Sequence, residues 1–197
     1  MEVYPYEPSF LLKAIGYYEG VKNLPQAARY YYLYGLRTQS TTAYEQALTY
    51  FLDFGQIRAA NRTANKLMRL GANDPESLYF ISKYYYNLKN YQKALSVLIR
   101  AYSLAAGANN NPKLAFDIGN TLARLYLLLG EKEKAVQLSQ NISNLAGNDI
   151  EALAKLAKLY KSLGLAENLN DCIRRIQDIT ITKGKQGWMK KLVKVKD

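Results

Sequence analysis

The sequence has no histidine and a single cysteine, two of the residue types that most often perform catalysis. None of its 197 residues is histidine, so the commonest general base and metal ligand is missing and no histidine-dependent catalytic triad can form. The chain also lacks the Gly-x-x-x-x-Gly-Lys-Ser/Thr pattern of a phosphate-binding loop, since the nearest stretch, Gly184-Lys185-Gln186-Gly187, has neither the spacing nor the context. We therefore expect no enzyme activity, no cofactor and no metal site.

Two further candidates for chemistry have simpler structural interpretations. Cys172 stands beside Ile173 in an expected helix, without a histidine to lower its pKa, so we interpret it as a packing residue rather than a nucleophile. Glu131 and Glu133 fall at an expected turn between helices, where acidic side chains ordinarily stabilise a helix start in solvent.

The charge of the chain is strongly basic and unevenly distributed. The formal net charge is +11, and residues 183–197 carry six lysines against Asp197 alone. A moderately basic body with a concentrated basic tail favours anionic partners, namely acidic protein surfaces, nucleic acid or anionic lipid. The alternative is a lysine-rich terminus that only keeps the protein soluble.

The elements that must position these charges repeat along the chain. Gly130 and Gly164 are 34 residues apart, as are Ala60 and Ala94, whereas the step from Lys89 to Gly130 is 41 because residues 106–112 form an expected loop insertion. A period of this length is typical of an array of helical repeats, in which each unit buries its apolar face against its neighbours.

The clearest repeat runs from Pro75 to Ala106. Leu78, Ile81, Tyr85 and Leu88 recur at spacings of three and four, which predicts one buried face of a helix. A short turn is expected at Lys89-Asn90, and a second helix follows it. The apolar residues of that helix that are expected to face inward are Ala94, Leu95, Leu98, Ala101 and Tyr102. Ser82 and Ala94 are small, as two helices need where they cross closely.

This pattern resembles the tetratricopeptide repeat (TPR). The third unit matches the family at Leu78, Ile81, Ser82, Tyr85, Tyr91, Ala94, Leu98 and Ala101. The fourth matches at Leu122, Ala123, Tyr126, Gly130 and Ala135, and the fifth at Leu153, Leu156, Ala157, Tyr160 and Gly164. Departures include Ile15, Ser139 and Leu169, which replace the residues that the family pattern has there.

The resemblance implies an all-α superhelical array, or α-solenoid, of antiparallel helix hairpins. It covers residues 8–182 in five units, approximately 8–40, 41–74, 75–115, 116–149 and 150–182. An extended segment, 1–7, precedes the array, and a basic segment, 183–197, follows it.

In such arrays the first helix of each hairpin lines the concave side. Position 9 of the last three units gives a series of basic residues: Lys83, Arg124 and Lys158. Nearby positions add Tyr79, Tyr86, Asn120, Lys155 and Lys161, and acidic residues are few there, Asp117 and Glu151. We expect a groove that holds an acidic or carboxylate-bearing partner segment, with Asn120 bonding its backbone. The alternative is that these are ordinary solvent-facing positions, where Lys and Arg are good helix formers.

Eighteen tyrosines gather in clusters such as Tyr30-Tyr31-Tyr32 and Tyr84-Tyr85-Tyr86. Consecutive residues of a helix point in different directions, so a cluster cannot be entirely core. We expect Tyr31 and Tyr85 in the core, and their neighbours at edges or in the groove. Exposed tyrosines favour protein interfaces, although they also stack on bases.

The basic tail is the second candidate contact region, through Trp188, Lys190, Lys191 and Lys194. Three interpretations stay open: a helix that caps the array, a basic amphipathic segment that docks on a partner or an anionic membrane, and a short alternating strand.

The sequence therefore predicts a non-catalytic scaffold or adaptor for protein–protein interaction, acting in the assembly of a multi-protein complex or in a chaperone-like role. A nucleic-acid-binding repeat protein that uses the same groove and tail is the alternative. The first residues lack a basic and apolar leader, no apolar run is long enough to span a bilayer, and the single cysteine fits a reducing compartment. We expect a cytoplasmic protein, although a mature form without its leader would look similar.

Overall fold

The computed structural model describes residues 7–71, 73–107 and 111–193, with side chains described through residue 182. It divides the chain into two compact units, Met1–Gly107 and Ala108–Asp197. The first unit holds α1 (Pro8–Gly20), α2 (Leu24–Thr38), α3 (Thr41–Asp53), α4 (Ile57–Leu70), α5 (Pro75–Asn87) and α6 (Tyr91–Gly107). The second holds α7 (Pro112–Leu128), α8 (Lys132–Ser143), the 3-10 turn η1 (Asn144–Ala146), α9 (Ile150–Leu163) and α10 (Ala166–Val193).

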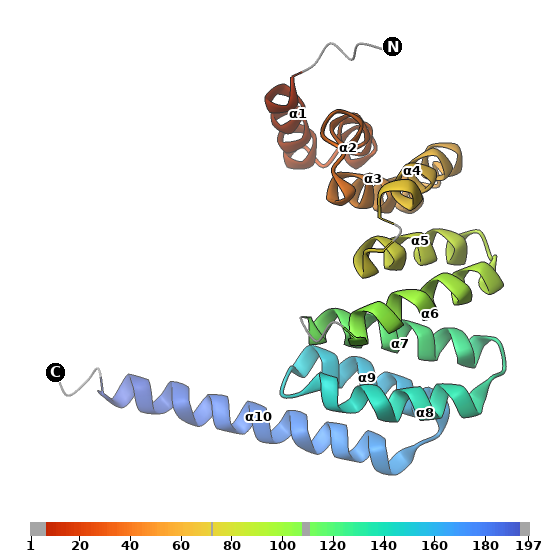
Figure 1. Cartoon of the computed structure of the whole chain (residues 1–197). Helices are drawn as coiled ribbons and strands as arrows, with labels where there is room; N and C mark the ends of the chain where they lie inside the picture. The colour runs from red at the N-terminus through yellow and green to blue at the C-terminus, as the bar shows by residue number, and fades with distance from the viewer. Residues whose placement is uncertain (1–6, 72, 108–110, 194–197) are drawn as a thin grey trace. The chain divides into compact units, whose positions relative to one another are not determined.

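Successive helices pair as hairpins within each unit, which confirms the predicted all-α repeat architecture (Figure 1). In the first unit α1 packs on α2, α3 on α4 and α5 on α6, and in the second α7 packs on α8 and α9 on α10. None of the described helices is both long and apolar enough to cross a membrane.

Small residues allow the paired helices to approach closely. Ala27, Ala60, Ala94 and Ala135 occupy equivalent positions in four hairpins, and at most 1% of each is exposed. Larger apolar side chains fill the space around them, among them Leu48, Leu67, Ile81, Leu98, Phe116, Leu153 and Leu156. Ser82 and Ala94, the small residues predicted at the crossing of the third hairpin, are both buried. Cys172 is buried too, and burial raises the pKa of its thiol, as suits a packing residue.

Every hairpin turns through one residue in the left-handed backbone region. Gly55, Gly130 and Gly164 have φ values of 65°, 82° and 78°, and Lys22 and Lys89 hold the same place with φ of 56°. Glycine enters this region without the steric penalty that a Cβ brings. The repeat phase read from the glycines therefore extends to the two hairpins in which lysine replaces glycine.

Two glycine-to-alanine changes are predicted to shift stability in opposite directions. Gly16 lies inside α1, where an added Cβ would meet no atom within 4 Å, so Gly16→Ala should stabilise the protein by about 0.5–1 kcal/mol. Gly130 has equal space but a φ of 82°, so Gly130→Ala should destabilise it by about 1 kcal/mol. Urea denaturation followed by circular dichroism measures both changes, and a shared sign would contradict this account.

The helices on either side of the insertion extend into the loop that was expected over residues 106–112, of which residues 108–110 lie outside the described part of the chain. Helix α6 continues to Gly107 and α7 begins at Pro112, each with 17 residues. The start of α7 is set by Asn111, whose side chain accepts a hydrogen bond of 3.0 Å from the Leu114 N–H, and by Pro112 in the first turn. The fourth hairpin therefore begins four residues before Phe116.

The tyrosines of the third hairpin are arranged differently from the prediction. Tyr84 is buried, and its hydroxyl donates to Asn61 Oδ1 of α4 at 3.0 Å, whereas Tyr85 is only half-buried. Contact with the preceding hairpin, which sequence spacing does not reveal, draws Tyr84 inward. In the first hairpin the tyrosines pack on one another, as in the stacked pair Tyr18 and Tyr30, with ring centroids 5.3 Å apart.

Candidate ligand-binding face

The first helices of the two hairpins in the second unit, α7 and α9, pack against each other. Helix α9 begins where the Asp149 side chain accepts hydrogen bonds from the N–H groups of Glu151 and Ala152, at 2.8 and 3.3 Å. These bonds hold the pKa of Asp149 below its usual value. The cap fixes the register of α9, so Glu151 and Lys155 lie one helical turn apart.

Lys155 binds both acidic side chains that were expected in the groove. Its Nζ lies 2.9 Å from Glu151 Oε1, on the same helix, and 2.9 Å from Asp117 Oδ1, on α7. Hydrogen bonds to Glu151 and then Asp117 raise the pKa of Lys155, and the bond from Lys155 lowers the pKa of Glu151. One lysine therefore bridges the two carboxylates and ties α7 to α9.

Arg124, Lys158 and Lys161 continue along the same two helices, and we call them together the α7–α9 face. Arg124 follows Asp117 by two helical turns, and Lys158 and Lys161 follow Lys155 by about one and two. All three side chains are exposed. In the part of the chain that the structure describes, the acidic partners of Lys155 form no ion pair with them, and neither does any other carboxylate.

Asn120 lies on α7 between Asp117 and Arg124, but it is more deeply placed than a groove residue was expected to be. Only 7% of the residue is exposed, and its Oδ1 receives no hydrogen bond from the described residues. A buried amide oxygen without a partner costs free energy. The expected bond from Asn120 to a ligand backbone would therefore need the surroundings of this side chain to open.

The remaining groove candidates lie in the first unit, on α5. Lys83 Nζ sits 4.2 Å from the centroid of the Tyr79 ring and 4.8 Å from that of Phe80, so this lysine rests on aromatic faces of its own helix. Tyr86 is 48% exposed, and its ring packs edge-on against Tyr91 of α6 at 5.4 Å. Lys83, Tyr79 and Tyr86 therefore belong to a different unit from the α7–α9 face. That Lys83, Arg124 and Lys158 line one continuous groove stays a prediction.

The predicted tail contacts lie largely beyond the described side chains. Helix α10 runs without a break from Ala166 to Val193, so Trp188, Lys190 and Lys191 belong to the last repeat helix. The alternative of a short strand covered residues 192–196. The helical backbone at Leu192 and Val193 contradicts its first part, and residues 194–196 lie outside the described residues. Lys194 lies outside the described residues.

Sequence reasoning placed Asp117, Glu151 and Lys155 near the groove but missed how they pair. Glu151 and Lys155 are four residues apart, a spacing that predicts an ion pair within one helix. The bond to Asp117 depends on how α9 lies beside α7, and no local pattern reports that.

Several solved structures of TPR proteins have a fold similar to that of this chain. The chain matches MamA with a TM-score of 0.62 and 18% identity, covering 90% of this chain and 94% of that one. It matches a thermophilic TPR protein of Thermus thermophilus with a TM-score of 0.63 and 17% identity, covering 91% and 98%. The chain has the TPR fold. PilF of Pseudomonas aeruginosa is also similar, with a TM-score of 0.66 and 14% identity over 87% of this chain and 75% of that one. No protein-family model and no curated protein matches the chain.

Proposed function

We propose that this TPR-fold chain is a non-catalytic scaffold that binds an acidic or carboxylate-bearing segment of a partner protein at the α7–α9 face. The observation that carries the proposal is the distribution of charge there. Lys155 occupies both nearby carboxylates, Asp117 and Glu151, which leaves Arg124, Lys158 and Lys161 exposed without an acidic partner among the described residues.

The chemistry of these three cations suits a carboxylate. Arginine presents a planar fork that can bind both oxygens of a carboxylate, while the two lysines act as mobile point charges beside it. Because the side chains are exposed, their contribution is to attract and select an acidic segment, and the interaction should weaken with salt. The TPR fold, with helix hairpins stacked side by side, supports a role in protein interaction, although fold alone does not define function.

The wider role that we propose is that of an adaptor in the assembly of a multi-protein complex, in the cytoplasm. The buried thiol of Cys172 and the absence of histidine in the sequence support a scaffold rather than an enzyme.

The proposal predicts a preference for acidic peptides that depends on the α7–α9 face. The probe is a randomised ten-residue peptide library without aromatic residues, with Asp or Glu at alternate positions, beside a matched library with Asn or Gln there. The protein should select the acidic library, and Arg124→Glu combined with Lys158→Glu should weaken binding about tenfold or more.

The matched control is Arg58→Glu with Lys132→Glu, which makes the same charge change at exposed positions on α4 and α8. Circular dichroism should report folded protein for both pairs. Equal losses in the two double variants, or equal binding of acidic and amide libraries, would contradict the proposal. Tighter binding of single-stranded oligonucleotides than of any acidic peptide at physiological salt would favour the nucleic-acid alternative instead.

A further inference from the structure

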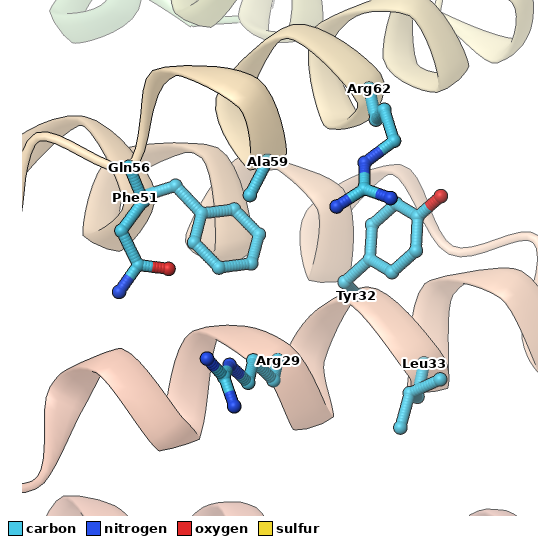
Figure 2. Close-up of a pocket in the computed structure, with 7 residues that line it drawn as sticks. All are labelled: Arg29, Tyr32, Leu33, Phe51, Gln56, Ala59 and Arg62. Atoms are coloured by element: carbon cyan, nitrogen blue, oxygen red, sulfur yellow. The ribbon is translucent and has the colours of Figure 1, made fainter.

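A cavity of about 320 Å³ lies in the first unit, on a different part of the chain from the α7–α9 face. It is formed by α2, the end of α3 and the first turns of α4 (Figure 2). Its lining is Arg29, Tyr32, Leu33, Phe51, Gln56, Ala59 and Arg62. This volume falls at the lower end of the roughly 300–1,000 Å³ typical of ligand pockets.

The inner part of the cavity is apolar and held in place by packing. Phe51 is only 3% exposed and presents its ring between α2 and α4 (Figure 2). Tyr32 is fixed by an edge-on contact with Tyr44 of α3, at 5.8 Å between ring centroids. Tyr44 is itself 1% exposed. A rigid aromatic lining of this kind accommodates a large apolar side chain at little ordering cost.

The outer part of the cavity is positively charged. Arg29 extends from α2 and Arg62 from α4, so the two guanidinium groups come from different hairpins (Figure 2). Both residues are exposed, no lining residue is acidic, and neither arginine forms an ion pair within the described residues. Gln56 adds a neutral amide that is not used to cap α4. An occupant should therefore bring negative charge to the rim.

We propose that this cavity binds a second kind of partner segment, in which one large apolar side chain, preferably aromatic, is flanked by carboxylates. The aromatic group lies against Phe51 and Tyr32, and carboxylates on its two sides reach Arg29 and Arg62. A guanidinium pairs with a carboxylate through two parallel hydrogen bonds, which fixes both the position and the direction of the segment. This proposal goes beyond the proposed function of the α7–α9 face, because the cavity would recognise an apolar side chain of the partner as well as its negative charge.

The test uses synthetic ten-residue peptides with a central Phe or Trp and Asp or Glu on both sides. Binding is measured by fluorescence anisotropy to the Arg124→Glu, Lys158→Glu protein, so that the α7–α9 face does not contribute. Arg29→Gln with Arg62→Gln should weaken binding about tenfold or more. The control, Arg58→Gln with Arg69→Gln, removes two exposed arginines from α4 outside the cavity and should change it less than about twofold.

A second variant tests the cavity itself rather than its charge. Ala59→Leu places a larger side chain into the lining at a half-buried position and should weaken binding of the same peptides while circular dichroism stays unchanged. Equal binding of peptides with a central Ala, or equal losses in the two arginine pairs, would overturn the proposal. Tighter binding of phosphoserine peptides than of the carboxylate peptides, or failure of every acidic aromatic peptide to bind, would overturn it too.

Discussion

Replacing Glu45 by glutamine is expected to stabilise the protein at pH 8 and to leave it nearly unchanged at pH 4.5. Glu45 lies on α3 and is only 4% exposed. Its Oε1 accepts a hydrogen bond of 2.7 Å from Ser77 Oγ of α5. Burial raises the pKa of Glu45 from 4.5 to about 7, against the lowering effect of the Ser77 bond and with a further rise from Glu76 and Asp74.

The direction of the pH effect follows from proton binding. Between pH 4.5 and about 7 the folded protein keeps a proton on Glu45 that the unfolded chain releases, so stability falls as the pH rises through this window. Above about pH 7 the buried carboxylate is charged and lowers the free energy of unfolding by about 3 kcal/mol, as such a difference in pKa implies. The substitution Glu45→Gln would keep an acceptor for the Ser77 hydroxyl without that charge.

Urea denaturation at pH 4.5 and pH 8, followed by circular dichroism, measures this effect in the first unit. Circular dichroism is the suitable signal because the only tryptophan, Trp188, belongs to the second unit. The control is Glu76→Gln, which removes a carboxylate nearby that is less deeply buried than Glu45. A wild-type free energy of unfolding that is equal at both pH values would contradict the account, as would an equal gain from the control.

Gly71→Ala is expected to destabilise the protein by about 2 kcal/mol, in the range typical of overpacking. An added Cβ at Gly71 would clash with the Cβ and the Oγ of Ser77. Ser77 has little freedom to move, because its N–H donates to Asp74 Oδ2 at 2.7 Å and its hydroxyl donates to Glu45. Relieving the clash would break one of these bonds.

The same variant has an internal test. Ser77→Gly removes the two atoms with which an added Cβ would clash and leaves the Leu67 carbonyl oxygen, at 3.3 Å, as its nearest neighbour. In a double-mutant cycle, Gly71→Ala should therefore cost much less in the Ser77→Gly background than in the wild type. Thermal or urea unfolding of the four proteins gives the coupling. Additive effects would show that the contact between residues 71 and 77 does not limit the packing of α4 on α5.

The repeat phase was predictable because it depends on local chemistry. Gly130 and Gly164 mark hairpin turns that need a left-handed residue, and the alanines mark helix crossings. The turn at Lys89 was predicted from the break in the apolar pattern, whereas the turn at Lys22 carries no glycine to mark it, and lysine rarely adopts that backbone conformation. The start of α7 was predictable from Asn111 and Pro112, a capping residue followed by proline, although the expected loop extended over both residues.

The candidate sites were predictable only in part, because burial of polar groups depends on contacts between hairpins. Glu45 and Asn120 are residue types that are mostly exposed, yet both are buried, and Glu45 accepts a hydrogen bond from Ser77 of the next hairpin. The repeat phase predicts equivalent places for Arg124 and Lys158, whereas the ion pair between Asp117 and Lys155 depends on the packing of α7 on α9. Arg29 and Arg62 are nearly one repeat apart in the sequence, but only the structure reveals the cavity between them.

The most direct test of the proposed function is a map of amide chemical-shift changes when a ten-residue acidic peptide without aromatic residues is added to the protein. The account predicts that the largest changes fall on α7 and α9 around Arg124, Lys158 and Lys161, and that they disappear in the Arg124→Glu, Lys158→Glu protein. Changes confined to other helices, or no change at saturating peptide, would contradict a carboxylate-binding role for this face.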